Sequence, residues 1–441
     1  MANDATMRDY VDSELDQREQ TGHDVEELRA EARRTDLDTT ALADLLERIE
    51  AAPRGEFRYV EPDELDDILA ETDAHETDGT TPQRAALPEA FSDRMLAAWR
   101  GRVAGNMLGK PVEQGEYWTR ARLREYLVAA DAYPLTDYVP APDGLRQQYE
   151  LRPDNWDMTT RGRVDGSCRD DDVDYTVLGL HLLEKYGLDF TTEDVAEEWQ
   201  LRLPYHQTYT AERAAYRNLI EEIPPSQAAR HRNPYREWIG ALIRADIFGY
   251  VNPGRPDLAV RQAYRDARLS HTGNGIYGEQ WAAALTAAAL VADDVREAYD
   301  RARRYVPRQS RTAEAIDAVT ACYERGGTWE EALEDADRRW HGYHWVHTVN
   351  NAAVIAAALL WGEGDFTRSI ALTVQGGLDT DSNGATVGSV VGAVVGTGGI
   401  PAHWTDPLRD TVRSAVFGFD GVTISDLARR TESLATARGS S

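Results

Sequence analysis

Hydrophobic residues recur at the spacing of an α-helix along most of this chain. The first 70 residues contain a short predicted helix whose apolar face is formed by Leu42, Leu45, Leu46 and Ile49. From Leu87 onward most segments show this spacing, and alanine is common in the most apolar ones, such as 282–289 and 352–358. Strictly alternating runs, which are typical of strands, are scarce. Because small residues let helices approach closely, the pattern predicts an all-α fold, a compact bundle of many helices.

The same pattern divides the chain into three parts. Residues 1–70 are predicted to form an acidic helical N-terminal extension, and residues 71–86, which lack apolar periodicity, a flexible linker. Residues 87–437 are predicted to form the main domain. Within this domain the segment from Glu116 to Arg163 is rich in Tyr, Trp, Pro and Asp and departs from regular helix. Long ordered loops usually border a functional site, so we expect this excursion to do the same.

The charge of the chain limits its partners. Asp plus Glu number 76 and Lys plus Arg 48, which gives a formal net charge of -28. This excludes a general binder of nucleic acid or of anionic membranes, because both need a basic surface. Only Lys110 and Lys185 are lysines, and the other basic residues are arginines. A G+C-rich genome alone would explain that preference, but the acid excess favours a salt-adapted, halophilic protein.

The sequence also predicts the compartment. Cys168 and Cys322 are the only cysteines, they form no CxxC pair, and two thiols cannot build a disulfide framework. The first residues are charged and contain no apolar segment of the kind found in signal peptides. The longest run of low charge, 383–404, is interrupted by repeated glycine and by Pro401, so no membrane span is predicted. We therefore expect a cytoplasmic protein.

A first acidic cluster lies at the start of a predicted helix. Asp170, Asp171 and Asp172 precede an apolar helix that Gly187 ends. Aspartate is common at helix starts because it caps free N–H groups and suits the helix dipole. Consecutive side chains fan out around the first turn, so only one of the three can cap. The others are left as candidate metal ligands.

A second acidic cluster precedes a glycine-rich helix. Gly384, Gly388, Gly392 and Gly396 recur every four residues and predict a bare helix face against which another backbone packs. Asp379 and Asp381 project to one side of its start, with the hydroxyl of Ser382 beside them. An Asx turn with an N-cap accounts for one of these aspartates but not both. Oxygen donors without Cys or His favour Mg²⁺, Mn²⁺ or Ca²⁺. If the two clusters converge, roughly two divalent ions are needed against their repulsion.

Two further motifs complete a recognisable set. GRVAGNMLGKPVE ends at Glu113, and SHTGNGIYGE begins at Ser270. Together with the aspartate pair that opens a helix and with GGLDTDSNGATVGSVVGA, they resemble the ADP-ribosylglycohydrolase family, in the family's order, over roughly residues 95 to 435. The resemblance implies an orthogonal multi-helix bundle with a centre of two Mg²⁺ ions, sometimes Mn²⁺. It further implies hydrolysis at the anomeric carbon of a ribose, commonly in ADP-ribose attached to a protein side chain.

The family's metal motifs map onto this chain with substitutions. In the T-D-D-T motif Asp171 and Asp172 match, Asp170 replaces threonine, and Val173 lacks the last hydroxyl. In the G-D-T-D-T motif Asp379 and Asp381 match, Leu378 is added before them, and Ser382 replaces threonine. Asn106 replaces an aspartate of the remaining motif, whose final acid matches Glu113. The extension and the excursion lie outside the resemblance.

The resemblance implies roles for these residues, with the main domain as the catalytic domain. The predicted metal ligands are Asp170, Asp171, Asp172, Asp379, Asp381 and Ser382. The predicted catalytic carboxylates, among which the general base is left open, are Asp170, Glu113 and Asp379. The predicted substrate contacts are Gly109, His271, Asn274, Gly275, Asn350, Gly376 and Gly377.

Three functions remain in competition at this point. The leading prediction is a metal-dependent hydrolase of ADP-ribosylated protein or of an ADP-ribose derivative, so its partner is a small ribosyl molecule or a modified protein. A hydrolase of nucleoside-type N-ribosides is a close alternative. A catalytically silent, crystallin-like structural protein is a different class. Retention of Asp171, Asp172, Asp379 and Asp381 argues against the silent protein, because a structural protein has no reason to keep repelling carboxylates together.

Overall fold

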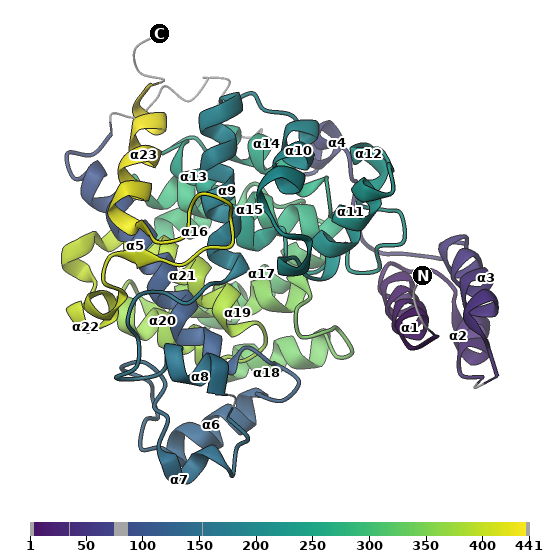
Figure 1. Cartoon of the computed structure of the whole chain (residues 1–441), viewed down its shortest axis with the longest axis horizontal. Helices are drawn as coiled ribbons and strands as arrows, with labels where there is room; N and C mark the ends of the chain where they lie inside the picture. Colours follow the sequence, from purple (N-terminus) through teal and green to yellow (C-terminus); the bar gives the residue numbers. More distant parts are fainter. Residues whose placement is uncertain (1–3, 35, 75–86, 152, 438–441) are drawn as a thin grey trace.

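The computed structural model describes residues 4–34, 36–74, 87–151 and 153–437. Its first four helices belong to the predicted N-terminal extension: α1 Asp4–Gln20, α2 Glu26–Ala32, α3 Thr39–Glu50 and α4 Leu65–Ala70. Helix α3 buries Leu42, Leu45, Leu46 and Ile49, the apolar face expected from the sequence. Helices α1 to α3 pack around a small core of their own and stand beside the body of the molecule (Figure 1).

The body of the molecule is helical almost throughout, which confirms the all-α prediction. Strands β1 Thr411–Val412 and β2 Val422–Thr423 pair antiparallel and form the one named sheet among the described residues. The helices are α5 Phe91–Gly109, α6 Arg120–Ala129, α7 Asp143–Arg146, α8 Pro153–Thr159, α9 Asp171–Tyr186, α10 Thr192–Arg202, α11 Thr210–Ile220, α12 Pro225–Ala228, α13 Asp246–Tyr250, α14 Pro256–Ala267, α15 Gly273–Ala289, α16 Val295–Arg303, α17 Arg311–Glu324, α18 Trp329–Arg339, α19 Thr348–Gly362, α20 Phe366–Gln375, α21 Thr380–Val395, α22 Ala402–Thr405 and α23 Ile424–Ala437.

Helices α5 and α21 pack antiparallel with their backbones in contact. A Cβ atom built on Gly105 would lie 1.9 Å from the carbonyl oxygen of Gly384, and one on Gly101 would lie 2.0 Å from that of Gly388. The predicted glycine face of α21 is therefore confirmed, and its partner is the glycine series of α5. Gly396 does not belong to this face, because it comes after the last residue of α21 with a φ of +70°. This packing brings the C-terminal end of α5 to the N-terminal end of α21.

The centre of the body is built from mainly apolar helices that are buried on all sides. Every residue of α15 is buried, and α19 is buried along almost its whole length. A helix with this composition has no polar face to turn toward water, so it must be surrounded by other helices. Helix α19 also packs against α21. Asn351 of α19 accepts hydrogen bonds from the backbone of Asp379 and the side chain of Asn383, at the start of α21.

The excursion from 116 to 163 is more helical than its sequence predicted. It contains α6, α7 and α8, which lie together at one end of the molecule (Figure 1). A cluster of four aromatic side chains holds these helices together: Trp118, Tyr126, Tyr149 and Trp156. Aromatic contacts of this kind replace the regular apolar spacing by which sequence analysis recognises a helix.

The extension meets the body through residues that are far apart in sequence. Ile68 of α4 packs with Tyr264 and Tyr277 in a small buried cluster. Of the predicted linker, residues 75–86 lie outside the described residues, whereas Glu71 and Asp73 bond to the backbone of the 304–308 segment. The placement of the domain boundary stays a prediction.

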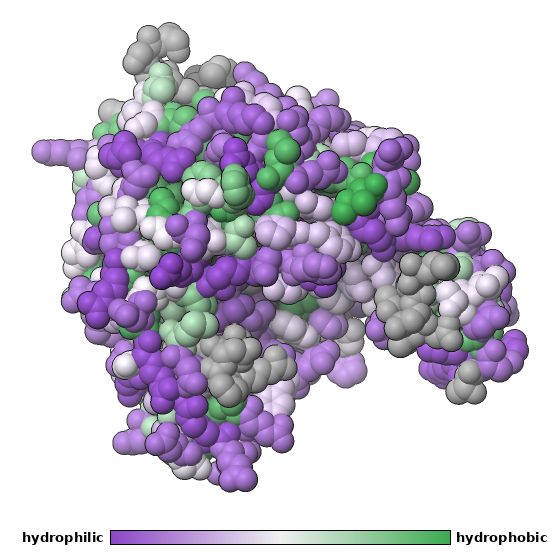
Figure 2. Space-filling model, in the orientation of Figure 1, coloured by the Kyte–Doolittle hydropathy of each residue, from purple (hydrophilic) through white to green (hydrophobic). Residues whose placement is uncertain are grey.

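The face seen in Figure 2 is mainly hydrophilic, with small scattered hydrophobic areas. None of the described helices is both long and apolar enough to cross a membrane.

Candidate metal centre and cavity

The first acidic cluster lies at the start of α9. Asp170 is the N-cap residue, and its Oδ1 accepts a hydrogen bond of 3.2 Å from the backbone N–H of Asp172. One aspartate of the three therefore caps the helix, as expected. Arg102 of α5 is fully buried and donates to the backbone carbonyl of Asp172 at 2.5 Å while pairing with Asp246 at 2.7 Å. This arginine fixes the first turn of α9 against α5.

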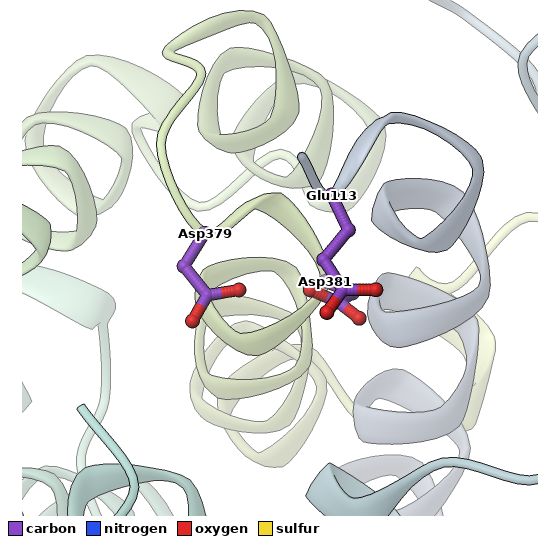
Figure 3. Close-up of side chains that lie close together, drawn as sticks. All are labelled: Glu113, Asp379 and Asp381. Atoms are coloured by element: carbon purple, nitrogen blue, oxygen red, sulfur yellow. The ribbon is translucent and has the colours of Figure 1, made fainter. Parts of the chain in front are cut away.

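The second acidic cluster lies at the start of α21. Asp379 is the residue before the helix, and Asp381 and Ser382 are in its first turn. The hydroxyl of Thr380 donates to the carbonyl of Gly109 at 2.9 Å and so joins the two helix ends. Glu113 comes directly after the 3-10 turn Lys110–Val112, which follows the end of α5. Figure 3 shows its carboxylate beside that of Asp381.

The two clusters converge, as the metal hypothesis requires. Glu113, Asp379 and Asp381 bring carboxylate oxygens within 4.8 Å of one another, and so do Asp170, Asp172 and Asp381. Asp381 belongs to both groups and lies between them. Apart from Glu113, these side chains are almost completely buried. Asp172 Oδ1 has no hydrogen-bond partner in the described part of the chain. All the donors are oxygens, so the set fits hard divalent cations such as Mg²⁺ or Mn²⁺.

The structure adds a cation that the sequence analysis did not place in the cluster. Lys110 Nζ lies 2.7 Å from Glu113 Oε2, 2.5 Å from Asp170 Oδ2 and 3.0 Å from Asp381 Oδ2. Burial by itself would lower the pKa of this lysine, but the three carboxylates outweigh burial and hold the pKa well above its usual value. Lys110 therefore offsets part of the repulsion, which the sequence analysis had assigned to divalent ions alone. The need for two such ions stays a prediction.

Burial and charge separate the pKa values of the carboxyl groups. Burial raises the pKa of Glu113 to about 7, and the charge of Asp381 adds to this effect. Burial also raises the pKa values of Asp171, Asp172 and Asp379 well above the usual range. The negative charges of neighbouring carboxylates raise these pKa values further. For Asp170, the ammonium of Lys110 and the N–H of Asp172 outweigh burial and hold the pKa at about 2.

Residues of the acidic centre line a cavity of about 480 Å³. Aromatic rings line it as well, among them Trp238, which stacks on His344 with ring centroids 4.1 Å apart and planes inclined by 10°. Tyr209 and Trp345 also belong to the lining. A cavity of this size is typical of small-molecule sites. The sequence showed an aromatic stretch around His344, but nothing in it connected Trp238 to that stretch.

Glu212 is a further wall residue that the sequence analysis missed. It is buried beside Gly240, where a Cβ atom would lie 2.1 Å from its Oε1, and it accepts a hydrogen bond of 2.5 Å from Arg244. Burial raises its pKa to about 7, because Arg244 also pairs with Asp266 and so offsets burial only in part. No spacing in the sequence marks a lone glutamate in α11 as part of a cavity.

Comparison with known proteins places these observations in a family. The ADP-ribosylglycohydrolase family model matches residues 87–440. The chain belongs to this family. An uncharacterized protein of Archaeoglobus fulgidus is 24% identical over 331 residues, which cover 74% of this chain and 93% of that protein. A solved chain described as an ADP-ribosylglycohydrolase-related protein complex has 21% identity and a TM-score of 0.46, over 80% of this chain and 100% of the other.

Three of the predicted substrate contacts in this ADP-ribosylglycohydrolase family member lie behind the cavity wall. His271 is fully buried and bonds to the hydroxyl of Ser270. Asn274 donates to Glu237 and accepts from Thr312, so its side chain is occupied within the core. Gly275 faces the carbonyl of Arg236, from which a Cβ atom would be 2.7 Å away. Substrate contact by these residues stays a prediction without support from the cavity lining.

The other four predicted contacts surround the centre without lining the cavity. Gly109 packs on Thr380, and Gly376 and Gly377 form the turn after α20, where Gly377 has a φ of +75°. Asn350 donates to the backbone carbonyl of His344, a residue of the cavity lining. Its neighbour Asn351 reaches the centre, because its Oδ1 accepts from the backbone N–H of Asp379 at 3.2 Å.

Proposed function

We propose that this protein is a metal-dependent glycohydrolase that cleaves the bond at the anomeric carbon of a ribose in ADP-ribosylated protein or in an ADP-ribose derivative. One observation carries the proposal: Asp381 joins two groups of three carboxylates that border a cavity lined by aromatic rings. Family membership supports the glycohydrolase class.

The proposed cofactor is a pair of Mg²⁺ ions, with Mn²⁺ as a substitute. Glu113, Asp379 and Asp381 would hold one ion, and Asp170, Asp172 and Asp381 the other, with Asp171 and Ser382 as further ligands. When bound, such ions supply charge that orients ribose hydroxyls and lowers the pKa of a water molecule.

The remaining tasks fall to side chains of the chain itself. The carboxylates of the acidic centre would stabilise the positive charge that develops on the ribose ring in the transition state. Glu113 is the favoured general base, because its carboxylate lines the cavity and a third of its side chain is exposed. Asp170 is less suited as a base, because its Oδ2 forms an ion pair with Lys110 and its Oδ1 caps the N-terminus of α9.

The aromatic rings of the cavity lining support a substrate with a planar group. The stacked pair of Trp238 and His344 offers a flat surface against which a base can lie. Arg169 and Lys110 are the basic residues of the lining, and both are paired with aspartates, so a diphosphate has few free partners there. The nucleoside alternative therefore remains as the second candidate.

An activity panel tests the proposal. Protein stripped with EDTA would be assayed with and without Mg²⁺ or Mn²⁺, at low and at molar salt, on ADP-ribosyl-arginine, ADP-ribosyl-serine and plain nucleosides. Turnover that requires metal on the ADP-ribosyl substrates supports the leading function. Turnover on nucleosides alone selects the second candidate, and no turnover on any of them favours the silent structural protein.

The Asp381→Asn variant tests the centre itself. It is expected to lose metal affinity and at least about a hundredfold in turnover while remaining folded, since the change removes a shared ligand and relieves repulsion. The matched control is Asp365→Asn, because Asp365 caps α20 at the surface and asparagine caps equally well. Calorimetric titration with Mg²⁺ and turnover would be measured on both. Near normal turnover of Asp381→Asn would remove the catalytic assignment.

A further inference from the structure

The ammonium group of Lys110 lies among the oxygens that the proposed metal ions need. It contacts one carboxylate of each group, Glu113 and Asp170, and also Asp381, which the groups share. The ammonium donates hydrogen bonds to Glu113 and Asp381, and it forms an ion pair of 2.5 Å with Asp170 Oδ2. In a chain with two lysines and 46 arginines, one of the two is placed here.

The fold holds this lysine in place. Lys110 comes directly after Gly109, whose bare Cα lies against Thr380, and its backbone N–H bonds to Asn106. The next residue, Pro111, is buried. The backbone is therefore fixed beside the start of α21, and only the side chain is free to change its position.

A second cavity beside the centre can accommodate the side chain of Lys110. A smaller cavity of about 150 Å³ adjoins the first, and Lys110 and Glu113 line both. Gln114 and Glu150 also line the smaller cavity and offer oxygen acceptors for an ammonium group. A swing of the Lys110 side chain would therefore exchange one polar environment for another and leave the carboxylates free.

We propose that Lys110 is a built-in cation of the centre: it holds the carboxylates together in the metal-free chain and competes with divalent ions for Glu113, Asp170 and Asp381. This inference rests on the metal centre of the proposed function. A divalent ion bound by these oxygens and an ammonium at 2.5 to 3.0 Å from the same oxygens repel each other, so one displaces the other.

Competition has two consequences of opposite sign for the Lys110→Met variant. Without metal, the variant should melt several degrees lower than the natural chain, because the carboxylates lose their only close cation among the described side chains. With metal, it should bind more tightly, because no ammonium has to be displaced. By linkage, the metal-induced rise in melting temperature should be larger in the variant.

The matched control is Lys185→Met, which changes the other lysine of the chain. Lys185 Nζ also contacts a buried carboxylate, Glu198, at 2.5 Å, but this pair belongs to α9 and α10 and does not line the cavity. Full-length, EDTA-stripped proteins would be titrated with Mg²⁺ and with Mn²⁺ in a calorimeter and melted with and without metal. We expect about tenfold tighter binding for Lys110→Met and unchanged binding for Lys185→Met. Equal or weaker binding by Lys110→Met would overturn the inference.

A second measurement avoids the variant if it does not fold. Reductive methylation of the natural chain, read by mass spectrometry, reports on two lysines and the N-terminus only. Without metal, Lys110 should react at least about tenfold more slowly than Lys185, and saturating Mg²⁺ should speed its reaction. A rate at Lys110 that Mg²⁺ leaves unchanged or lowers would contradict displacement.

The two hypotheses fail in different ways. If neither the natural chain nor Lys110→Met binds a divalent ion, the proposed metal-dependent function fails and the competition fails with it. If the natural chain binds metal and Lys110→Met binds it more weakly, the lysine assists the metal. In that case only the present inference is overturned.

Discussion

Two contacts between distant segments are built in opposite ways. Helices α5 and α21 meet backbone to backbone through glycines, with no side chain between them at Gly101, Gly105, Gly384 or Gly388. The N-terminal extension meets the body through buried ion pairs. Glu14 of α1 pairs with Arg236 at 2.6 Å, and Arg311 pairs at 2.7 Å with both Glu61 of the extension and Glu237 of the body.

The difference reflects what each contact has to position. The glycine contact brings the two halves of the acidic centre together, and a backbone contact allows almost no adjustment. The ion-pair contact fastens the extension to the segment around Arg236 and Glu237, which directly precedes the cavity residue Trp238. It does so under strong repulsion, because the first 70 residues hold 21 acidic and 8 basic residues, a net charge of -13. The extension thus lies behind one wall of the cavity. Buried ion pairs with Arg236 and Arg311 hold it there, together with the apolar contacts of Ile68.

The ion-pair contact should break most severely at its centre. Arg311→Met leaves the carboxylates of Glu61 and Glu237 buried without their cation, and we expect a loss of about 3–5 kcal/mol in unfolding free energy. The control Arg296→Met removes an arginine that also contacts two carboxylates, but at the surface, and should lose at most about 1 kcal/mol. Urea unfolding of both variants measures the difference. Equal losses would show that burial does not strengthen the contact.

The glycine contact should break with the smallest possible side chain. Gly105→Ala places a methyl group 1.9 Å from the backbone carbonyl oxygen of Gly384, so the two helices must move apart. We expect the unfolding free energy to fall by about 2–3 kcal/mol. Gly144→Ala, the control in α7, meets no atom within 4 Å and should gain up to about 1 kcal/mol. Urea unfolding and Mg²⁺ titration would be done on both. A stable Gly105→Ala variant that binds metal normally would contradict the role given to this contact.

Acid should weaken the ion-pair contact alone. Burial would raise the pKa of Glu237, but Arg311 outweighs burial and lowers the pKa below its usual value of 4.5. A lowered pKa contributes stability that is present above pH 4.5 and is lost as pH falls through the folded value. The difference in unfolding free energy between the natural chain and Glu237→Gln should therefore be about 2 kcal/mol at pH 7 and should shrink below pH 4.5. A difference that is constant down to pH 3 would contradict this account.

Salt should give the smallest effect and should act mainly on the extension. Raising the salt from about 0.05 to 1 M screens the repulsion within the first 70 residues. We expect amide exchange in α1 to α3 to slow by roughly several-fold. The part of α21 from Gly384 onward, which packs on α5 through uncharged glycine contacts, should change by less than about twofold. Hydrogen exchange read by mass spectrometry measures both regions in one sample. Equal responses would show that the salt effect is general, and no response would remove the prediction of salt adaptation.

Local patterns predicted those elements that are stabilised by near neighbours. The apolar face of α3 depends on residues three or four apart, and the cap at the start of α9 on residues two apart, although the sequence left open which of the three aspartates caps. The pattern failed for α6, where contacts with Trp118, Tyr149 and Trp156 replace helical periodicity. It also failed for Gly396, because this residue ends α21 with a positive φ instead of extending its bare face.

The sequence by itself determined the all-α class, because apolar residues recur at helical spacing along most of the chain. It placed two clusters of aspartates at helix starts, as candidate ligands. It also determined that a second backbone lies against α21, since only such a contact explains its bare face. Only the tertiary structure decided that Lys110 lies among those acids, that Trp238 and Glu212 line the same cavity, and which arginines hold the extension. These contacts join residues that are tens to hundreds of positions apart. Charge pairing and burial between such residues depend on how helices cross, and no local pattern records that.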